Sequence, residues 1–364
     1  MRYEVSIVDV PADVGAPLAE ALSLIGWRPS AGEPYLLKPN MLNPKSSEAG
    51  VTTDPHVISA LVSFLRAGGC GALVGDSPGN AYPGRAREVF EATGMLKAVE
   101  EADASFVEFE SLPPKVVEID GKVIKSMALA AQIFKSRVIN VPKLKTHVQT
   151  MMTGALKNVA FGCIPGSGKG AMHIKGNSPE RIASAIVDVY SAIRPRISLN
   201  VMDAIICMEG NGPSAGKARR IGKLLASTDA LALDMVSFRL AGVEPKAVPY
   251  VKEAMDRSLG PCSFDEIEIH GEMPSNIKFK LPSTYLASIA SSLGGAFTSV
   301  INSSVSFNQS KCTRCGSCAA ACPVSAITIG ESVELDRSKC IRCFVCYEMC
   351  EQGAIKVKRP IFRR

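Results

Sequence analysis

The chain has 364 residues, of which 46% are hydrophobic and 21% are charged, and its formal net charge is +6. These values are typical of a globular protein with a large apolar core, and they exclude a disordered or fibrous chain. The length exceeds that of a typical single domain, so two or three folded units are expected.

Short apolar runs alternate with amphipathic helical patterns over the first three hundred residues. Strands are predicted at 3–10, 35–38, 71–74, 105–109, 137–141, 197–207, 223–226 and 266–270. Helices are predicted at 17–25, 56–67, 85–101, 179–193, 229–240 and 248–258, and a hairpin at 115–125. Asp54 is expected to cap the second helix. The alternation predicts an α/β fold with a mostly parallel sheet and helices on both faces.

A first strand that begins near Met1 leaves no room for a secretory signal peptide, so a cytoplasmic location is expected. The apolar segment from Tyr285 to Val305 contains six serines and two glycines, which makes it too polar for a transmembrane helix. We expect a linker or packing helix there and no membrane span. The predicted domains are residues 1–280, a connecting segment at 281–305 and a small domain at 306–364.

Several polar loops follow predicted strands of the sheet. In a parallel α/β sheet the loops at the carboxyl ends of the strands form the ligand crevice, so these residues are expected to meet. The candidate binding residues are Lys38, Asn40, Ser77, Lys143, Lys145, Lys157, Asn158, Glu209 and Asn211. Asp76 and His147 are the candidate catalytic residues, as proton donors.

The crevice is expected to bind a small anionic molecule, because it combines lysines with glycine-rich loops that offer backbone N–H groups. Lys143, Lys145 and Lys157 would hold the charge of the ligand. The alternative is that each lysine is an ordinary surface residue and each glycine an ordinary turn. The run from Gly166 to Gly170 looks like a phosphate-binding loop but departs from the Walker pattern at Cys163 and Gly170, so a flexible loop is predicted.

Eight of the twelve cysteines lie between residues 312 and 350 and form two copies of the run Cys-x2-Cys-x2-Cys-x3-Cys. This spacing is typical of bacterial ferredoxins with two [4Fe–4S] clusters, in which the fourth cysteine of each run binds the other cluster. The predicted ligand sets are Cys312, Cys315, Cys318 and Cys350 for one cluster, and Cys340, Cys343, Cys346 and Cys322 for the other. Zinc would leave half of these thiols unexplained, and a disulfide framework is typical of small secreted domains. Glu351 departs from the pattern, which has a proline after the fourth cysteine.

Basic residues are concentrated near these cysteines. Residues 303–364 contain ten lysines and arginines against five acidic residues, while the rest of the chain is nearly neutral. A basic surface would attract a redox partner protein with an acidic surface, although ordinary surface charge explains the excess equally well. No motif for binding nucleic acid accompanies it.

The loops around Lys38-Pro39-Asn40, Gly75-Asp76-Ser77-Pro78-Gly79 and Pro142-Lys143-Leu144-Lys145-Thr146-His147 resemble a widespread prokaryotic family. So do Thr153-Gly154-Ala155-Leu156-Lys157-Asn158 and the segment from Asp203 to Pro213. This family is known as domain of unknown function 362, or uncharacterised iron–sulfur centre proteins, and it often carries a C-terminal two-cluster ferredoxin module. The resemblance covers nearly the whole chain and implies electron transfer through the clusters.

The sequence therefore predicts an iron–sulfur oxidoreductase of anaerobic metabolism that passes electrons to an anionic substrate or cofactor in the α/β domain. A flavin is one candidate cofactor, although no dinucleotide-binding fingerprint is present. The alternative is a non-catalytic electron carrier, or a cofactor or metal maturation factor whose α/β domain docks a partner. The sequence leaves the oligomeric state open, and a homodimer is one of the alternatives.

Overall fold

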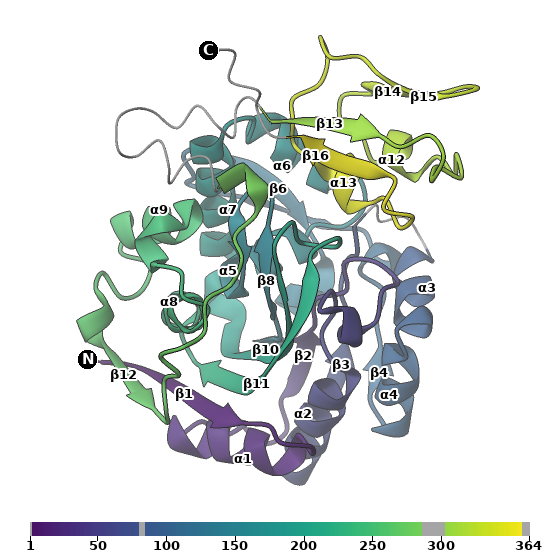
Figure 1. Cartoon of the computed structure of the whole chain (residues 1–364). Helices are drawn as coiled ribbons and strands as arrows, with labels where there is room; N and C mark the ends of the chain where they lie inside the picture. Colours follow the sequence, from purple (N-terminus) through teal and green to yellow (C-terminus); the bar gives the residue numbers. More distant parts are fainter. Residues whose placement is uncertain (1, 80–83, 286–302, 359–364) are drawn as a thin grey trace.

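The computed structural model describes residues 2–79, 84–285 and 303–358. An α/β domain forms most of the molecule, and the C-terminal residues form a small module on top of it (Figure 1). The predicted connecting segment at 281–305 lies mostly outside the described residues, because positions 286–302 are not among them. Among the described helices, none has the length and apolar composition needed to span a membrane.

A mixed, mostly parallel sheet forms the centre of the α/β domain. Its strand order is β12 (Ile267–His270), β1 (Tyr3–Asp9), β11 (Lys217–Ser227), β10 (Ile197–Glu209), β7 (Arg137–Asn140), β2 (Pro34–Lys38), β3 (Gly71–Val74) and β4 (Ser105–Phe106). From β10 to β4 every pair is parallel, whereas β11 runs antiparallel to both β1 and β10. The predicted fold class is confirmed.

Helices cover both faces of this sheet, and each face has its own apolar core. One face is covered by α1 (Gly15–Leu24), α2 (Pro55–Ala67), α3 (Arg85–Ala92) and α4 (Met95–Glu101). The other is covered by α5 (Ala155–Gly162), α6 (Gly168–Lys175), α7 (Pro179–Ile193), α8 (Ala230–Leu240) and α9 (Pro249–Asp256). A hairpin of β5 (Lys115–Glu118) and β6 (Ser126–Leu129) extends beside this second layer.

Local sequence signals set several element boundaries. The side chain of Asp54 accepts a hydrogen bond of 2.9 Å from the backbone N–H of His56 and caps α2, as predicted. The helix predicted at 85–101 is instead two helices, because Gly94 adopts a φ of 75° that a continuous helix does not allow. Short 3-10 helices occur at Ser47–Ala49, Phe109–Ser111, Ala131–Phe134, Arg194–Arg196, Pro245–Ala247 and Phe264–Glu266.

The lysine-rich segment after β7 was predicted as a loop but continues the sheet. It forms β8 (Lys143–His147), which pairs with β10, and β9 (Met151–Thr153), which pairs antiparallel with β8. All five residues of β8 are buried. Buried lysines are rare in strands, so the segment was misread; here other side chains and carbonyl groups satisfy these ammonium groups.

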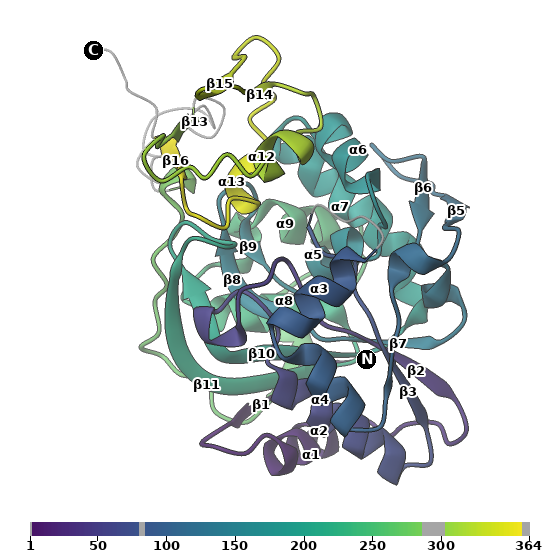
Figure 2. The ribbon, with the colours of Figure 1, turned by 90° about the vertical axis from the view of Figure 1, so that its right-hand side faces the viewer.

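The C-terminal module repeats one small unit. It contains β13 (Ser304–Phe307), α12 (Ser317–Ala320), β14 (Ile327–Ile329), β15 (Val333–Leu335), α13 (Val345–Glu348) and β16 (Ile355–Lys358). Strand β13 pairs with β16, and β14 pairs with β15. Arg314 and Arg342 occupy the same place in the two cysteine runs, and both have positive φ angles, of 55° and 56°. In Figure 2 the module lies beside α6 and above α3 and the β8–β9 end of the sheet.

Candidate functional site

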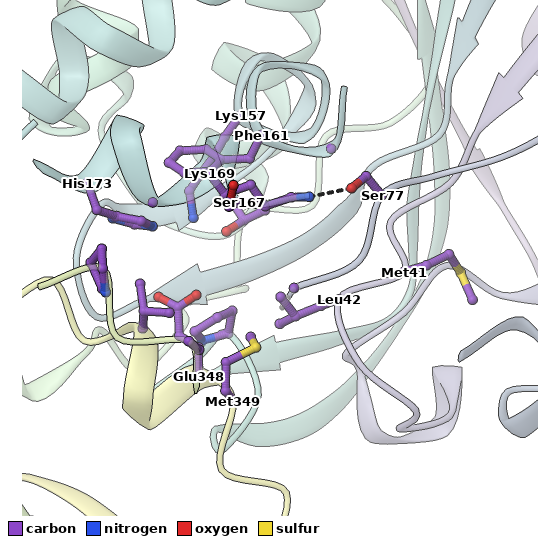
Figure 3. Close-up of a pocket in the computed structure, with 18 of the residues that line it drawn as sticks. Met41, Leu42, Ser77, Lys157, Phe161, Ser167, Lys169, His173, Glu348 and Met349 are labelled. Atoms are coloured by element: carbon purple, nitrogen blue, oxygen red, sulfur yellow. Dashed lines mark hydrogen bonds between the residues drawn. The ribbon is translucent and has the colours of Figure 1, made fainter. Parts of the chain in front are cut away.

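A cavity of about 570 Å³ lies between the α/β domain and the C-terminal module. Figure 3 shows Lys157, Phe161, Lys169 and His173 on one side of it, and Glu348 and Met349 of the module on the other. Its polar lining comprises Asn40, Asp76, Ser77, Lys145, His147, Thr153, Lys157, Asn158, Ser167, Lys169, His173 and Glu348. Its volume falls within the range of small-molecule sites.

Lys38 and Asp76 form a buried ion pair at one edge of the cavity, with 2.7 Å between Nζ and Oδ1. The other oxygen of Asp76 accepts the backbone N–H of Met41 at 2.8 Å. Burial raises the pKa of Asp76, and the ammonium of Lys38 opposes this effect. Gly162 leaves the space for this pair, because a Cβ there would collide with the Lys38 ammonium. Lys38 does not line the cavity; it holds Asp76 in place.

Lys143 also does not line the cavity, which corrects its predicted role as a ligand anchor. Its Nζ lies 2.9 Å from Oδ2 of Asp203, and neither side chain is exposed. The same oxygen accepts the backbone N–H of Asp54 at 2.7 Å, and Oδ1 accepts that of Ile205 at 3.1 Å. Lys143 therefore joins β8 to β10 and to the start of α2.

A chain of amide hydrogen bonds positions Lys145 at the cavity wall. The Lys145 ammonium donates to Oδ1 of Asn40 and to the carbonyl of Val51, both at 2.7 Å. Asn40 in turn donates to Oδ1 of Asn158 at 2.9 Å, and Asn158 donates to Asn140 at 2.8 Å. Burial, reinforced by the neighbouring Lys157, lowers the pKa of Lys145 well below its usual value. Asn40, Lys145 and Asn158 are thus brought together as predicted.

Lys157 enters the cavity from α5. Its Nζ lies 5.4 Å from the centre of the Phe161 ring, a cation–π distance. Among the described residues, no hydrogen bond or ion pair satisfies this ammonium. Burial lowers the pKa of Lys157 to about 8, and the nearby carboxylate of Glu348 opposes the effect. At neutral pH Lys157 therefore remains a cation that is available to a ligand.

The glycine-rich segment that was predicted to be a flexible loop contributes a further cation. Gly168 begins α6, and the Lys169 ammonium on that helix contacts Ser77 Oγ and donates to the carbonyl of Ile164 at 2.7 Å. Ser77 donates to Glu110 at 2.5 Å. Burial lowers the pKa of Lys169 to about 8. The only sequence signal for Lys169 was the incomplete phosphate-loop pattern.

His147 and Glu348 meet across the domain boundary. The Nε2 of His147 lies 3.2 Å from Oε1 of Glu348. The backbone N–H of Gln149 donates to Nδ1 of His147 at 3.1 Å, which assigns the ring proton to Nε2. Burial and then the cations Lys157 and Lys145 lower the pKa of His147 well below its usual value, whereas burial raises that of Glu348 to about 7. Sequence reasoning missed Glu348 because it belongs to a distant segment of the chain.

Four cavity-lining side chains have a buried polar atom without a hydrogen bond among the described residues. Oδ1 of Asp76 and Oε1 of Glu348 still have ion-pair contacts, whereas Oγ1 of Thr153 and Nδ1 of His173 have no partner of either kind in this part of the chain. His173 packs against Phe161 with 5.2 Å between ring centres. Burial lowers the pKa of His173 to about 3, so its ring is neutral at physiological pH. Buried polar groups are usually satisfied, so these two atoms are suited to a ligand.

Glu209 and Asn211 lie outside the cavity, which corrects their predicted role. Glu209 pairs with Arg219 at 3.0 Å and accepts the backbone N–H of Lys280. The carbonyl of Asn211 accepts the hydroxyl of Tyr347 at 2.5 Å. Both residues stabilise the contact of the β10–β11 turn with its neighbours, and Asn211 holds the C-terminal module.

The eight clustered cysteines line two further cavities within the module. The larger, of about 170 Å³, is lined by Cys322, Cys340, Cys343 and Cys346 with apolar neighbours such as Phe344. The smaller, of about 20 Å³, is lined by Cys312, Cys315, Cys318 and Cys350. Each cavity thus takes three cysteines from one run and one from the other.

The surroundings of these thiols suit iron–sulfur clusters. Backbone N–H groups of Ala326 and Ala354 donate to the sulfurs of Cys322 and Cys350, both at 3.2 Å, and such bonds stabilise thiolates. Among the described residues, no three His, Cys, Asp or Glu side chains close around the position of a single metal ion. Each of the two cavities is lined by four thiols, which is the ligand set that a [4Fe–4S] cubane requires. Glu351, where the ferredoxin pattern has proline, pairs with Arg85 of α3 at 2.9 Å and ties the module to the α/β domain.

Two family models match separate parts of the chain. Residues 36–239 match the family model "Domain of unknown function (DUF362)", and residues 304–351 match a 4Fe-4S dicluster domain. A thylakoid-associated protein of Synechocystis sp. is 34% identical over 248 residues, covering 68% of this chain and 74% of that protein. The lactate racemase apoprotein of Thermoanaerobacterium thermosaccharolyticum superposes with a TM-score of 0.47 at 8% identity, covering 67% of this chain and 58% of that structure. This chain therefore belongs to the DUF362 family and carries a C-terminal ferredoxin-type 4Fe-4S domain.

Proposed function

We propose that this protein is an iron–sulfur oxidoreductase that passes electrons through two [4Fe–4S] clusters to an anionic ligand in the interdomain cavity. The observation that supports this proposal most strongly is that Cys322 and Pro323 line both the larger cysteine cavity and the interdomain cavity. One short segment therefore separates a cluster from the ligand. Ferredoxin-type domains support electron transfer, and the cavity supplies a place for the acceptor.

The grouping of the thiols supports the ligand assignment. We assign Cys312, Cys315, Cys318 and Cys350 to one cluster, and Cys340, Cys343, Cys346 and Cys322 to the other. When bound, such clusters supply single-electron transfer. Cys315 is exposed, whereas Phe344 beside the second set is buried, so electrons from a partner protein would enter at the first set. Both the partner and the cytoplasmic location stay predictions.

His147 is the residue that we assign to proton supply. Its Nε2 lies at the cavity wall, 3.2 Å from Oε1 of Glu348, and a proton that the ring gives up to the ligand would be replaced through that carboxyl. Asp76 is held by Lys38 and Met41 and is better suited to shaping the site. A pure electron carrier would not require a cavity lined by three lysines, so the geometry favours an enzyme over a carrier. A flavin is not part of the proposal, because the sequence carries no dinucleotide-binding fingerprint.

Native mass spectrometry of anaerobically purified protein tests the proposal. The expected result is a mass increment of two [4Fe–4S] clusters together with a co-purified organic anion. The double variant Lys145→Met/Lys157→Met should keep the clusters and lose the anion. Retention of the same anion by this variant, or a holoprotein with a single cluster, would contradict the proposal.

A further inference from the structure

The cations of the cavity fall into two groups. Lys145 and Lys169 already donate to carbonyl or side-chain oxygens. Among the described residues, Lys157 is the cavity lysine whose ammonium has no such oxygen partner, and it is only 8% exposed. The Lys157 ammonium lines the cavity and is therefore open to an acidic ligand.

Two further residues with unsatisfied groups line the same cavity as Lys157. Thr153 lies two residues before α5 begins at Ala155, and Lys157 occupies the first turn of this helix. His173 and Lys157 both contact the ring of Phe161. The centres of the His173 and Phe161 rings are 5.2 Å apart, and Nζ of Lys157 lies 5.4 Å from the centre of the Phe161 ring. Thr153 Oγ1 and His173 Nδ1 are buried and lack a protein partner among the described residues. Thr153, Lys157 and His173 thus form one cluster of free polar groups, which we call the acid-binding triad.

The opposite wall of the cavity has a different character. The C-terminal module contributes Ala320, Ala321, Pro323, Val345 and Met349, which are apolar, and Glu348 is its single charged lining residue among those described. This wall includes the Cys322–Pro323 segment that also borders the cysteine cavity. Figure 3 shows Met349 across the cavity from Lys157, Phe161 and His173. The cavity is therefore polar on the side of the α/β domain and apolar on the side of the clusters.

We propose, building on the proposed function, that the ligand is an amphipathic organic acid with its acid group on the acid-binding triad. Its apolar body lies against Ala321, Pro323 and Met349. The part beside the cluster has to accept an electron, and a saturated chain has no low-lying orbital for it. The apolar body is therefore an aromatic ring or a conjugated double-bond system.

Binding of small probes to the anaerobic holoprotein tests the ligand class by calorimetry. Trans-cinnamate should bind about 100-fold more tightly than acetate, because its styryl group is removed from water. Cinnamyl alcohol, which lacks the charge, should bind at least about 10-fold more weakly than cinnamate. Phenyl phosphate tests whether the acid group of the ligand is a phosphate. If phenyl phosphate binds more tightly than cinnamate, the ligand is still an amphipathic acid, and its acid group is a phosphate. Equal affinities for acetate and cinnamate, or for cinnamate and its alcohol, would overturn it.

A matched pair of variants tests the role of the triad. Lys157→Met should weaken cinnamate binding about 10-fold or more and leave the affinity for cinnamyl alcohol unchanged. Lys175→Met removes an exposed lysine of the same charge from the end of α6, outside the cavity lining, and should change neither affinity. Equal losses in both variants would indicate a general charge effect and contradict the triad.

The orientation of the ligand has its own measurement. With the clusters reduced, ring-deuterated cinnamate should produce deuterium modulation of the cluster spin echo, and carboxyl-¹³C cinnamate should produce a weaker effect. Bound cinnamate without deuterium modulation would overturn the orientation, and with it the proposed function. Absence of cinnamate binding would overturn the ligand class alone, because another anion could still accept the electrons.

Discussion

Replacing Lys143 with methionine should lower the free energy of unfolding, because this lysine stabilises the fold and does not bind the ligand. The 2.9 Å pair between Lys143 and Asp203 is fully buried, so the substitution leaves the Asp203 carboxylate without its counter-charge. Removal of one partner of a buried pair costs about 3–5 kcal/mol. Asp203 retains two backbone N–H donors, from Asp54 and Ile205, which places the expected loss near the lower end, about 3 kcal/mol.

Urea unfolding followed by tryptophan fluorescence measures this loss. Trp27 is the single tryptophan of the chain, and it packs against Tyr35 and Phe64 in the α/β domain, so it reports on the relevant unfolding. Lys157→Met is the matched control: it removes a buried lysine without a described oxygen partner, so the free energy of unfolding should change by less than about 1 kcal/mol. The reasoning would be refuted if Lys143→Met kept the wild-type stability, or if Lys157→Met were the more destabilising change.

Three further predictions concern the cavity and the clusters. His173 has a pKa of about 3 in the folded protein and about 6.5 when unfolded, so the unfolded state gains a proton first as pH falls. The free energy of unfolding should therefore fall below pH 6.5, and His173 alone should account for a loss of about 2 kcal/mol at pH 5. In urea titrations at different pH values, His173→Gln should remove that part of the loss. An unchanged pH dependence in this variant would argue against a neutral buried His173. Gly162→Ala should lower the free energy of unfolding by about 1–3 kcal/mol, because the added Cβ collides with the Lys38–Asp76 pair; wild-type stability would show that this pair can move aside. Cys318→Ala should lose one cluster and retain the other, as counted by iron analysis of the anaerobic protein, whereas full iron content would contradict the ligand assignment.

The fold was largely readable from sequence because its signals are local. The apolar run from Arg137 to Asn140 and the capping by Asp54 depend on neighbouring residues, and the structure has both. β8 was missed because its strand character comes from burial: Asp203 and Asn40, which stabilise Lys143 and Lys145, are remote in sequence. Propensity carries no information about such distant partners.

The sequence predicted only those residues of the candidate site whose positions follow from local signals, because partners that are distant in sequence decide the rest. Asn40, Lys145, Lys157 and Asn158 follow from strand ends and lie together at the cavity. Lys38 and Lys143 have the same sequence context, but buried carboxylates pair with them, and only the tertiary structure reveals this difference. Glu348 belongs to the C-terminal module, so its place in the cavity depends on how the module docks.

A nitroxide carboxylate measures electron transfer from the clusters to an anion in the cavity. The protein is photoreduced, separated from excess donor and mixed anaerobically with 3-carboxy-PROXYL, which takes up one electron and one proton to form the hydroxylamine. We expect nitroxide loss with saturation kinetics that is strongly slowed in Lys157→Met, while the uncharged 3-carbamoyl-PROXYL reacts without saturation. Equal rates for both probes, unaffected by Lys157→Met, would mean that electrons leave from the exposed face at Cys315 and would contradict the account.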